Sequence, residues 1–69
     1  MKISARNIIK GKVVEVQPGT VNSEIVLEIP GGTKLVSIIT KESAENLGLA
    51  VGKTAYAIIK ASNVLIGVD

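Results

Sequence analysis

Apolar and polar residues alternate along most of this chain, and the clearest alternation runs from residue 21 to residue 29. One face of that stretch carries Val21, Ser23, Ile25, Leu27 and Ile29. A period of two residues is typical of a strand that buries one face and leaves the other in solvent. Turn sequences bound the stretch, Pro18-Gly19 before it and Pro30-Gly31-Gly32 after it. We therefore predict a half-buried strand here, followed by a hairpin.

Further stretches rich in β-branched residues predict more strands. They are residues 8–17, 33–40, 54–60 and 63–68. Gly11 lies inside the first of them, where a glycine usually marks a bulge or a close approach of two backbones.

The pattern changes after Thr40, because helix formers replace the β-branched residues. Thr40 is a suitable N-cap and Gly48 a suitable stop, so we predict one helix of about two turns over residues 41–47. Five strands with a short helix between the third and the fourth indicate a mainly β fold. The architecture that we expect is a five-stranded Greek-key barrel of the oligonucleotide/oligosaccharide-binding (OB) type, in one domain over residues 1–69.

The composition shows how such a small domain could be stabilised. A chain of 69 residues buries only about 60% of its unfolded surface and is marginally stable alone. It has no cysteine and no histidine, which excludes disulfides, zinc sites of the usual kind, and thiol or imidazole catalysis. Its core must be aliphatic, since Tyr56 is the only aromatic residue. Self-association is the remaining means of stabilisation, and we expect a homo-oligomer.

The charge pattern narrows the choice of partners. The net charge is +2 and the charged residues are dispersed, which argues against a polybasic surface for nucleic acid or membrane. No apolar run approaches the ~18 residues of a membrane span, and the first residues lack the apolar stretch of a signal peptide. We expect a cytoplasmic protein.

Catalysis finds little support in the sequence. The carboxylates occupy outward strand positions, the helix or the C-terminus, as expected of solvated side chains, and Gly31-Gly32 lacks the spacing of a phosphate loop. Binding of single-stranded nucleic acid needs aromatic platforms in a basic groove, and one tyrosine with a net charge of +2 does not provide them. We expect no enzyme activity, and the nucleic-acid module stays as an alternative.

Hydroxyl and cationic residues near the ends of the predicted elements favour small-anion binding. The helix start carries Thr40 and Ser43, on one side of the helix where backbone N–H groups are free. The remaining candidates flank the first strand and the junction of the last two: Ser4, Arg6, Lys60 and Ser62. Taken one at a time, each of these residues is equally consistent with a cap, a turn or a solvated surface position.

Several motifs in order resemble the molbindins, the stand-alone molybdate-binding Mop proteins that are also called molybdenum-pterin-binding proteins. The motifs are Ser4-Ala5-Arg6-Asn7, Ile39-Thr40-Lys41-Glu42-Ser43 and Ile59-Lys60-Ala61-Ser62. The resemblance implies an OB-type barrel assembled as a homohexamer, a trimer of dimers, with molybdate or tungstate bound at subunit interfaces. It assigns the main oxyanion site to Ser4, Ala5, Arg6, Thr40, Ser43, Lys60, Ala61 and Ser62. Val21 and Asn22 are the candidates for a second class of site.

From this resemblance we expect a protein that stores the oxyanion inside the cell. The chain carries neither the DNA-binding domain nor the ATPase domain of related regulators and transporters, so we expect neither function of it. A carrier of molybdopterin is the other alternative. It would need a pocket the size of the pterin ring. Because Tyr56 is the only aromatic residue, we do not expect stacking on that ring.

Overall fold

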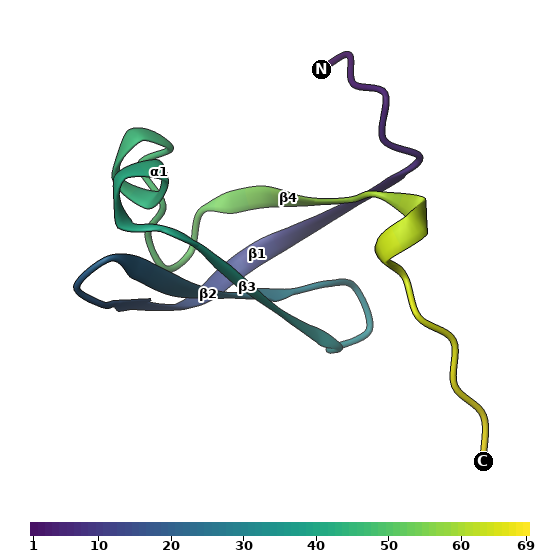
Figure 1. The fold of residues 1–69 in the computed structure, drawn as a ribbon. Helices are drawn as coiled ribbons and strands as arrows, with labels where there is room; N and C mark the ends of the chain where they lie inside the picture. Colours follow the sequence, from purple (N-terminus) through teal and green to yellow (C-terminus); the bar gives the residue numbers. More distant parts are fainter.

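The computed structural model describes residues 1–69 and consists of four strands, one α-helix and one 3-10 turn. In chain order the elements are β1 (Asn7–Pro18), β2 (Asn22–Glu28), β3 (Lys34–Thr40), α1 (Lys41–Asn46), β4 (Thr54–Ile59) and the 3-10 turn η1 (Ala61–Asn63). The strands form one antiparallel, curled sheet in the order β3-β2-β1-β4 (Figure 1). The predicted class, mainly β with one short helix between the third and fourth strands, is confirmed.

The long strand β1 organises the sheet. Its first half pairs with β4 and its second half with β2. Gly11 lies where β1 passes the end of β2, and a Cβ atom there would sit 2.9 Å from the backbone oxygen of Glu28. The predicted close backbone approach at Gly11 is therefore present, because only a residue without a Cβ fits that spacing. A β-bulge follows between Val13 and Glu15 and increases the local twist of the strand.

The helix α1 begins and ends as its sequence predicts. The Thr40 side chain accepts a hydrogen bond from the Ser43 backbone N–H at 3.0 Å, which caps the N-terminus. At the other end Gly48 has φ of +63°, and its N–H and that of Leu49 donate to the carbonyls of Glu45 and Ala44. This is a Schellman motif, which needs a residue that tolerates the left-handed conformation.

The hydrophobic core is small. Only 6 of the 69 residues are buried, and the central cluster is Val13, Ile25, Leu27 and Ala44. These side chains lie between the concave face of the sheet and α1. A core of this size supports the expectation that the chain is marginally stable alone. No helix is both long enough and apolar enough to cross a membrane.

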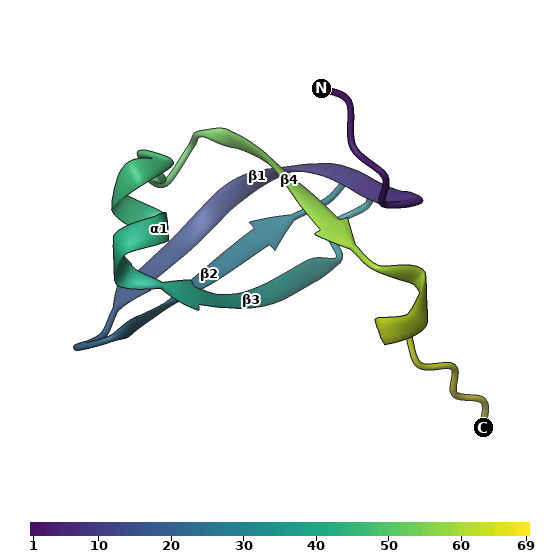
Figure 2. The same ribbon diagram turned by 45° about the horizontal axis from the view of Figure 1, so that its top comes forward.

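The predicted fifth strand, residues 63–68, is not formed, and the structure has four strands rather than five. Ala61–Asn63 makes the turn η1, and the residues after it have no regular secondary structure. Both views show this end of the chain running away from the sheet (Figure 1, Figure 2). A strand needs a neighbour for its backbone hydrogen bonds, and none lies beside these residues. The sheet consequently stays open between β3 and β4, and the closed Greek-key barrel is not present within this one chain.

Candidate functional site

The residues predicted to bind an oxyanion form two separate groups. The first, which we call the helix cluster, lies where β3 enters α1 and consists of Val21, Asn22, Thr40 and Ser43. The second, the terminal cluster, lies where the chain enters β1 and leaves β4, and consists of Ser4, Ala5, Arg6, Lys60, Ala61 and Ser62. Every member is exposed except Ala5, which is half-buried. Both clusters are therefore open to a ligand or to another protein surface.

Two hydroxyls in the helix cluster are hydrogen-bonded to each other. Thr40 Oγ1 donates to Ser43 Oγ at 2.8 Å and accepts from the Ser43 backbone N–H at 3.0 Å. The hydrogen of Thr40 is therefore already used, while the hydrogen of the Ser43 hydroxyl remains free to donate outward. Ser43 is thus the hydroxyl donor that this cluster can offer to an anion, beside the side-chain amide of Asn22.

The second-site candidates lie beside this pair. Asn22 is the register partner of Thr40 in the β2–β3 ladder, and the Val21 carbonyl accepts a hydrogen bond of 2.8 Å from the Lys41 backbone N–H. Val21 and Asn22 are thus neighbours of the helix start, although they were predicted as a separate class of site. In one chain the structure places the second-site candidates next to Thr40 and Ser43.

The terminal cluster is assembled by the pairing of β1 with β4. Asn7 is the register partner of Ile59, and its side-chain Nδ2 also donates to the Ile59 carbonyl at 3.3 Å. This contact sets the segment that contains Arg6 next to the segment that begins with Lys60. Two cationic side chains, far apart in sequence, are thereby brought to the same end of the sheet.

The two clusters lie at opposite ends of β1. The strand has 12 residues, and at about 3.3 Å per residue it would span roughly 36 Å if straight. Figure 2 shows α1 at one end of the sheet and η1 at the other. A tetrahedral oxyanion is only a few ångströms across, so the two clusters of one chain cannot both contact it.

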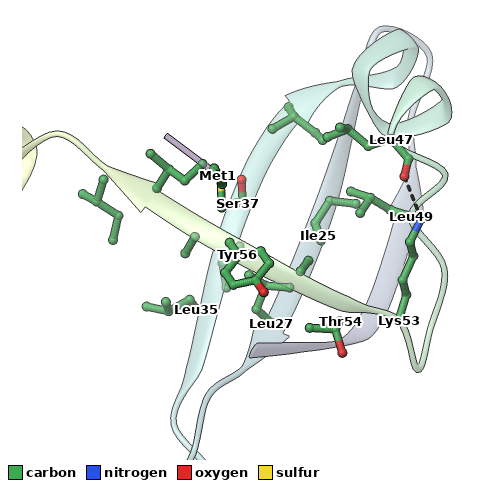
Figure 3. Close-up of a pocket in the computed structure, with 16 residues that line it drawn as sticks. Met1, Ile25, Leu27, Leu35, Ser37, Leu47, Leu49, Lys53, Thr54 and Tyr56 are labelled. Carbon is green, nitrogen blue, oxygen red and sulfur yellow. Dashed lines mark hydrogen bonds between the residues drawn. The ribbon is translucent and has the colours of Figure 1, made fainter. Parts of the chain in front are cut away.

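Two positioning residues were missed in the sequence. Asn7 fixes the terminal cluster as described. Lys53 Nζ donates to the Leu47 carbonyl at 2.9 Å (Figure 3) and to the Gly48 carbonyl at 3.2 Å, which satisfies the C-terminal end of α1. A lysine one turn beyond a helix-ending glycine was the available signal for Lys53. No comparable signal exists for Asn7, because its partner lies 52 residues away.

The electrostatic character of the two clusters differs. The terminal cluster contains two cations and no carboxylate, whereas Glu42 lies in the first turn of α1 beside the helix cluster. Nowhere does the structure bring together three or more histidine, cysteine, aspartate or glutamate side chains that could hold a metal ion. The donors present are hydroxyl, backbone N–H and cationic groups, which suit a ligand whose surface consists of oxygen acceptors.

Comparison with known proteins gives concordant matches over the whole chain. Residues 3–66 match the TOBE domain family. A probable molybdenum-pterin-binding protein from Haemophilus influenzae is 51% identical over 69 residues, the full length of both proteins. MopII from Clostridium pasteurianum has a TM-score of 0.93 at 48% identity, covering 97% of this chain and 100% of that one. The cytoplasmic molybdate-binding protein ModG, with molybdate bound, has a TM-score of 0.95 at 48% identity, covering 100% of this chain and 49% of ModG.

The fold and these matches define a TOBE-domain protein. Within that class the chain belongs to the molybdenum-pterin-binding (Mop) proteins, the molbindins. The family assignment made from the three sequence motifs is thus confirmed. The family is a binding family, with nothing in the matches that indicates catalysis.

Proposed function

We propose that this chain binds molybdate and tungstate at contacts between its own subunits and stores the oxyanion in the cytoplasm, without catalysing a reaction. The observation that carries the proposal is the 48% identity, over the full length of this chain, with ModG, which holds molybdate. The chemistry of the two clusters supports it, since their side chains are donors and cations.

The physical chemistry of the ligand matches this donor set. Molybdate is a tetrahedral dianion whose oxygens only accept hydrogen bonds. Removing it from water is costly unless every oxygen meets a donor. Ser43, Ser4 and Ser62 supply hydroxyl donors with no net charge, and Arg6 and Lys60 supply charge-assisted hydrogen bonds. A protonated phosphate would present a donor to these donors and leave one group unpaired.

The separation of the two clusters supports a site shared between chains. Because one chain cannot bring both clusters to the same ion, the complete donor set requires the helix cluster of one copy and the terminal cluster of another. This requirement is consistent with the homohexamer, a trimer of dimers, that the family resemblance implies. Val21 and Asn22, with the Lys41 backbone close by, remain the candidates for a second class of site.

Equilibrium dialysis against molybdate, tungstate, sulfate and phosphate tests the proposal. We expect retention of molybdate and tungstate and little retention of sulfate or phosphate at equal concentration. Equal retention of all four ions, or of none, would show that this chain is not a selective binder of the two metal oxyanions.

Substitution of the two cations tests the site assignment. We expect Arg6→Ala and Lys60→Ala each to weaken molybdate binding by about 10- to 100-fold in Kd, the usual effect of a lost hydrogen bond to a charged group. Lys12→Ala, on the exposed face of β1 and outside both clusters, is the matched control and should bind as the parent does. Parental affinity in both cluster variants would mean that the terminal cluster is not the site.

A carrier of molybdopterin is the second candidate, because an apolar groove of about 550 Å³ lies between β3 and β4 with Tyr56 on its wall. The groove is large enough for a pterin ring, yet 13 of its 16 lining residues are hydrophobic. A pterin edge carries several donors and acceptors, which this lining would leave without partners. Mass analysis of the ligand released from purified protein separates the two candidates, and we expect the oxyanion.

A further inference from the structure

Asn7 completes the motif Ser4-Ala5-Arg6-Asn7 but is not a member of the terminal cluster. It is the first residue of β1 and is half-buried. Its side-chain Nδ2 donates to the Ile59 carbonyl of β4 at 3.3 Å. Of the side-chain hydrogen bonds in the structure, this one alone joins two strands, since the others lie within β1 or at the ends of α1.

The position of this bond is the end of the ladder between β1 and β4. Asn7 and Ile59 are the last register pair, and the next residues outward are the two cations, Arg6 and Lys60. Beyond the pair no backbone hydrogen bond joins residues 1–6 to residues 60–63. Because the last pair of a ladder opens most easily, a side-chain bond placed there holds the two segments at a fixed spacing.

We propose that Asn7 is a positioning residue that sets the spacing between the two segments of the terminal cluster, and thereby the size of the tetrahedral dianion that the site prefers. It acts through Arg6 and Lys60 and makes the site favour molybdate and tungstate over sulfate, which is the smaller ion. The inference rests on the proposed oxyanion binding and adds to it the residue that determines selectivity.

Selectivity between these ions has to come from spacing. Molybdate and sulfate have the same charge and the same shape, and the oxygens of both only accept hydrogen bonds. The charge of the site therefore attracts both equally. Donors held at the spacing of the larger ion leave some bonds to the smaller ion unmade, whereas donors that are free to move close around either one. A residue that fixes the spacing changes the ratio of the two affinities, and a residue that supplies charge changes both affinities together.

A purely structural role for Asn7 predicts a different result. If the bond to the Ile59 carbonyl served stability alone, its loss would lower the free energy of unfolding and leave the ratio of affinities unchanged. Asn7 also lies outside the core cluster of Val13, Ile25, Leu27 and Ala44. We therefore expect substitutions of Asn7 to leave the fold intact, so that the ratio can be measured.

Equilibrium dialysis of Asn7→Leu measures this ratio. Leucine has nearly the size of asparagine and no donor. The Kd of molybdate is measured directly and that of sulfate by competition with molybdate. We expect the preference for molybdate to fall by about 10-fold, mainly through weaker binding of molybdate. Arg6→Ala, which removes a donor to either ion, should weaken both and keep the ratio within about twofold of the parent.

Asn46→Leu, at the exposed end of α1 and outside both clusters, is the matched control and should bind both ions as the parent does. An unchanged ratio in Asn7→Leu would overturn the inference. If Asn7→Leu does not fold by circular dichroism, Asn7→Ser decides, because its hydroxyl is one bond too short to reach the Ile59 carbonyl. The same fall in the ratio is expected there, and an unchanged ratio would have the same consequence.

A distance measurement tests the spacing itself without any oxyanion. Because the chain has no cysteine, Ser4→Cys/Ser62→Cys can be spin-labelled at these two positions alone. The labelled chain is refolded in an excess of unlabelled chain, so that the distance within one chain is measured by pulsed electron paramagnetic resonance. We expect a broader distance distribution when Asn7→Leu is added, and the parental distribution when Asn46→Leu is added.

Identical distributions with and without Asn7→Leu would show that Asn7 does not hold the two segments, and the inference would be wrong. The measurement also separates this inference from the proposed function. Failure of the parent to bind any of the oxyanions would refute the proposed function, whereas selective binding by the parent with an unchanged ratio in Asn7→Leu refutes only the role of Asn7.

Discussion

At the scale of the residue, Thr40 and Ser43 have different roles: Thr40 caps the helix, and Ser43 has a hydroxyl that can donate to a ligand. Thr40 uses its oxygen to accept from the Ser43 N–H and its hydrogen to reach the Ser43 hydroxyl. It is therefore committed to the structure of the helix start. Ser43 donates its backbone N–H and accepts at its hydroxyl oxygen, so its hydroxyl hydrogen stays available and it is the hydroxyl of the pair that can donate to a ligand. The two residues should accordingly respond differently to substitution.

We expect Thr40→Val to lower the free energy of unfolding by about 1 kcal/mol, because the Ser43 N–H loses its cap. Ser43→Ala keeps that N–H bond, so its stability should stay within about 0.5 kcal/mol of the parent. Its affinity for molybdate should nevertheless fall by about 10-fold, since one donor to the anion is lost. Urea denaturation at one protomer concentration and equilibrium dialysis measure the two effects.

Thr33→Ala, in the hairpin between β2 and β3 and outside both clusters, is the control for loss of a hydroxyl. It should change neither stability nor binding appreciably. Equal losses of stability in Thr40→Val and Ser43→Ala would contradict the division of tasks between the two hydroxyls.

How far the site could be predicted from sequence depended on the distance between partners. The pair Thr40 and Ser43 was found because one helical turn brings them together, which is a local property. The neighbourhood of Arg6 and Lys60 depends on the register in which β1 pairs with β4. No local pattern specifies that register. The motifs supplied the residues of the terminal cluster, and only the fold shows that they lie together and apart from the helix cluster.

At the scale of the element, α1 is too short to be stable by itself and depends on its ends. It has 6 residues, with Thr40 at one end and the Schellman motif at the other. Lys53 adds a cation at the negative end of the helix, where it bonds to two carbonyls that lack helical partners. The helix cluster depends on this element, so Lys53 supports the candidate site by stabilising α1.

We expect Lys53→Met to lower the free energy of unfolding by about 0.5 kcal/mol at low salt, and by less at high salt, because part of the effect is electrostatic. Lys41→Met is the matched control, since it removes a cation from the positive end of the same helix and should not destabilise it. Urea denaturation at two ionic strengths measures both. An equal loss in the two variants would mean that the position of the charge relative to the helix is irrelevant.

The elements themselves were predictable where each one is specified by its own residues. Four strands, the helix and its caps follow from alternation and from end signals that lie within a few residues of each other. The prediction of a fifth strand at residues 63–68 was wrong for the isolated chain, although its composition is that of a strand. The sequence pattern indicates which segments are able to pair, whereas pairing also needs an adjacent sheet edge. The free edges of this chain are β3 and β4, and residues 64–69 run away from both.

At the scale of the whole molecule, both ends of the sheet lead to the same conclusion about assembly. The 12-residue strand β1 separates the helix cluster from the terminal cluster. The core contains few buried residues, and apolar side chains remain exposed on β3, on β4 and in residues 64–68. Under the proposed function, a second copy would complete the donor set, and its surface would also cover some of these side chains.

Mixing two defective variants tests whether a site draws its clusters from different chains. Arg6→Ala impairs the terminal cluster and Ser43→Ala the helix cluster, so an assembly of either variant alone contains an impaired cluster at every site. The two variants are then unfolded together and refolded as a mixture. A shared site is intact when its terminal cluster comes from a Ser43→Ala chain and its helix cluster comes from an Arg6→Ala chain. With equal amounts and random assembly, roughly a quarter of the shared sites are intact in this way. Dialysis at low molybdate should therefore show tight sites in the refolded mixture that neither parent variant possesses. If each site belonged to one chain, mixing would restore none, and the refolded mixture would bind no better than the average of its parents.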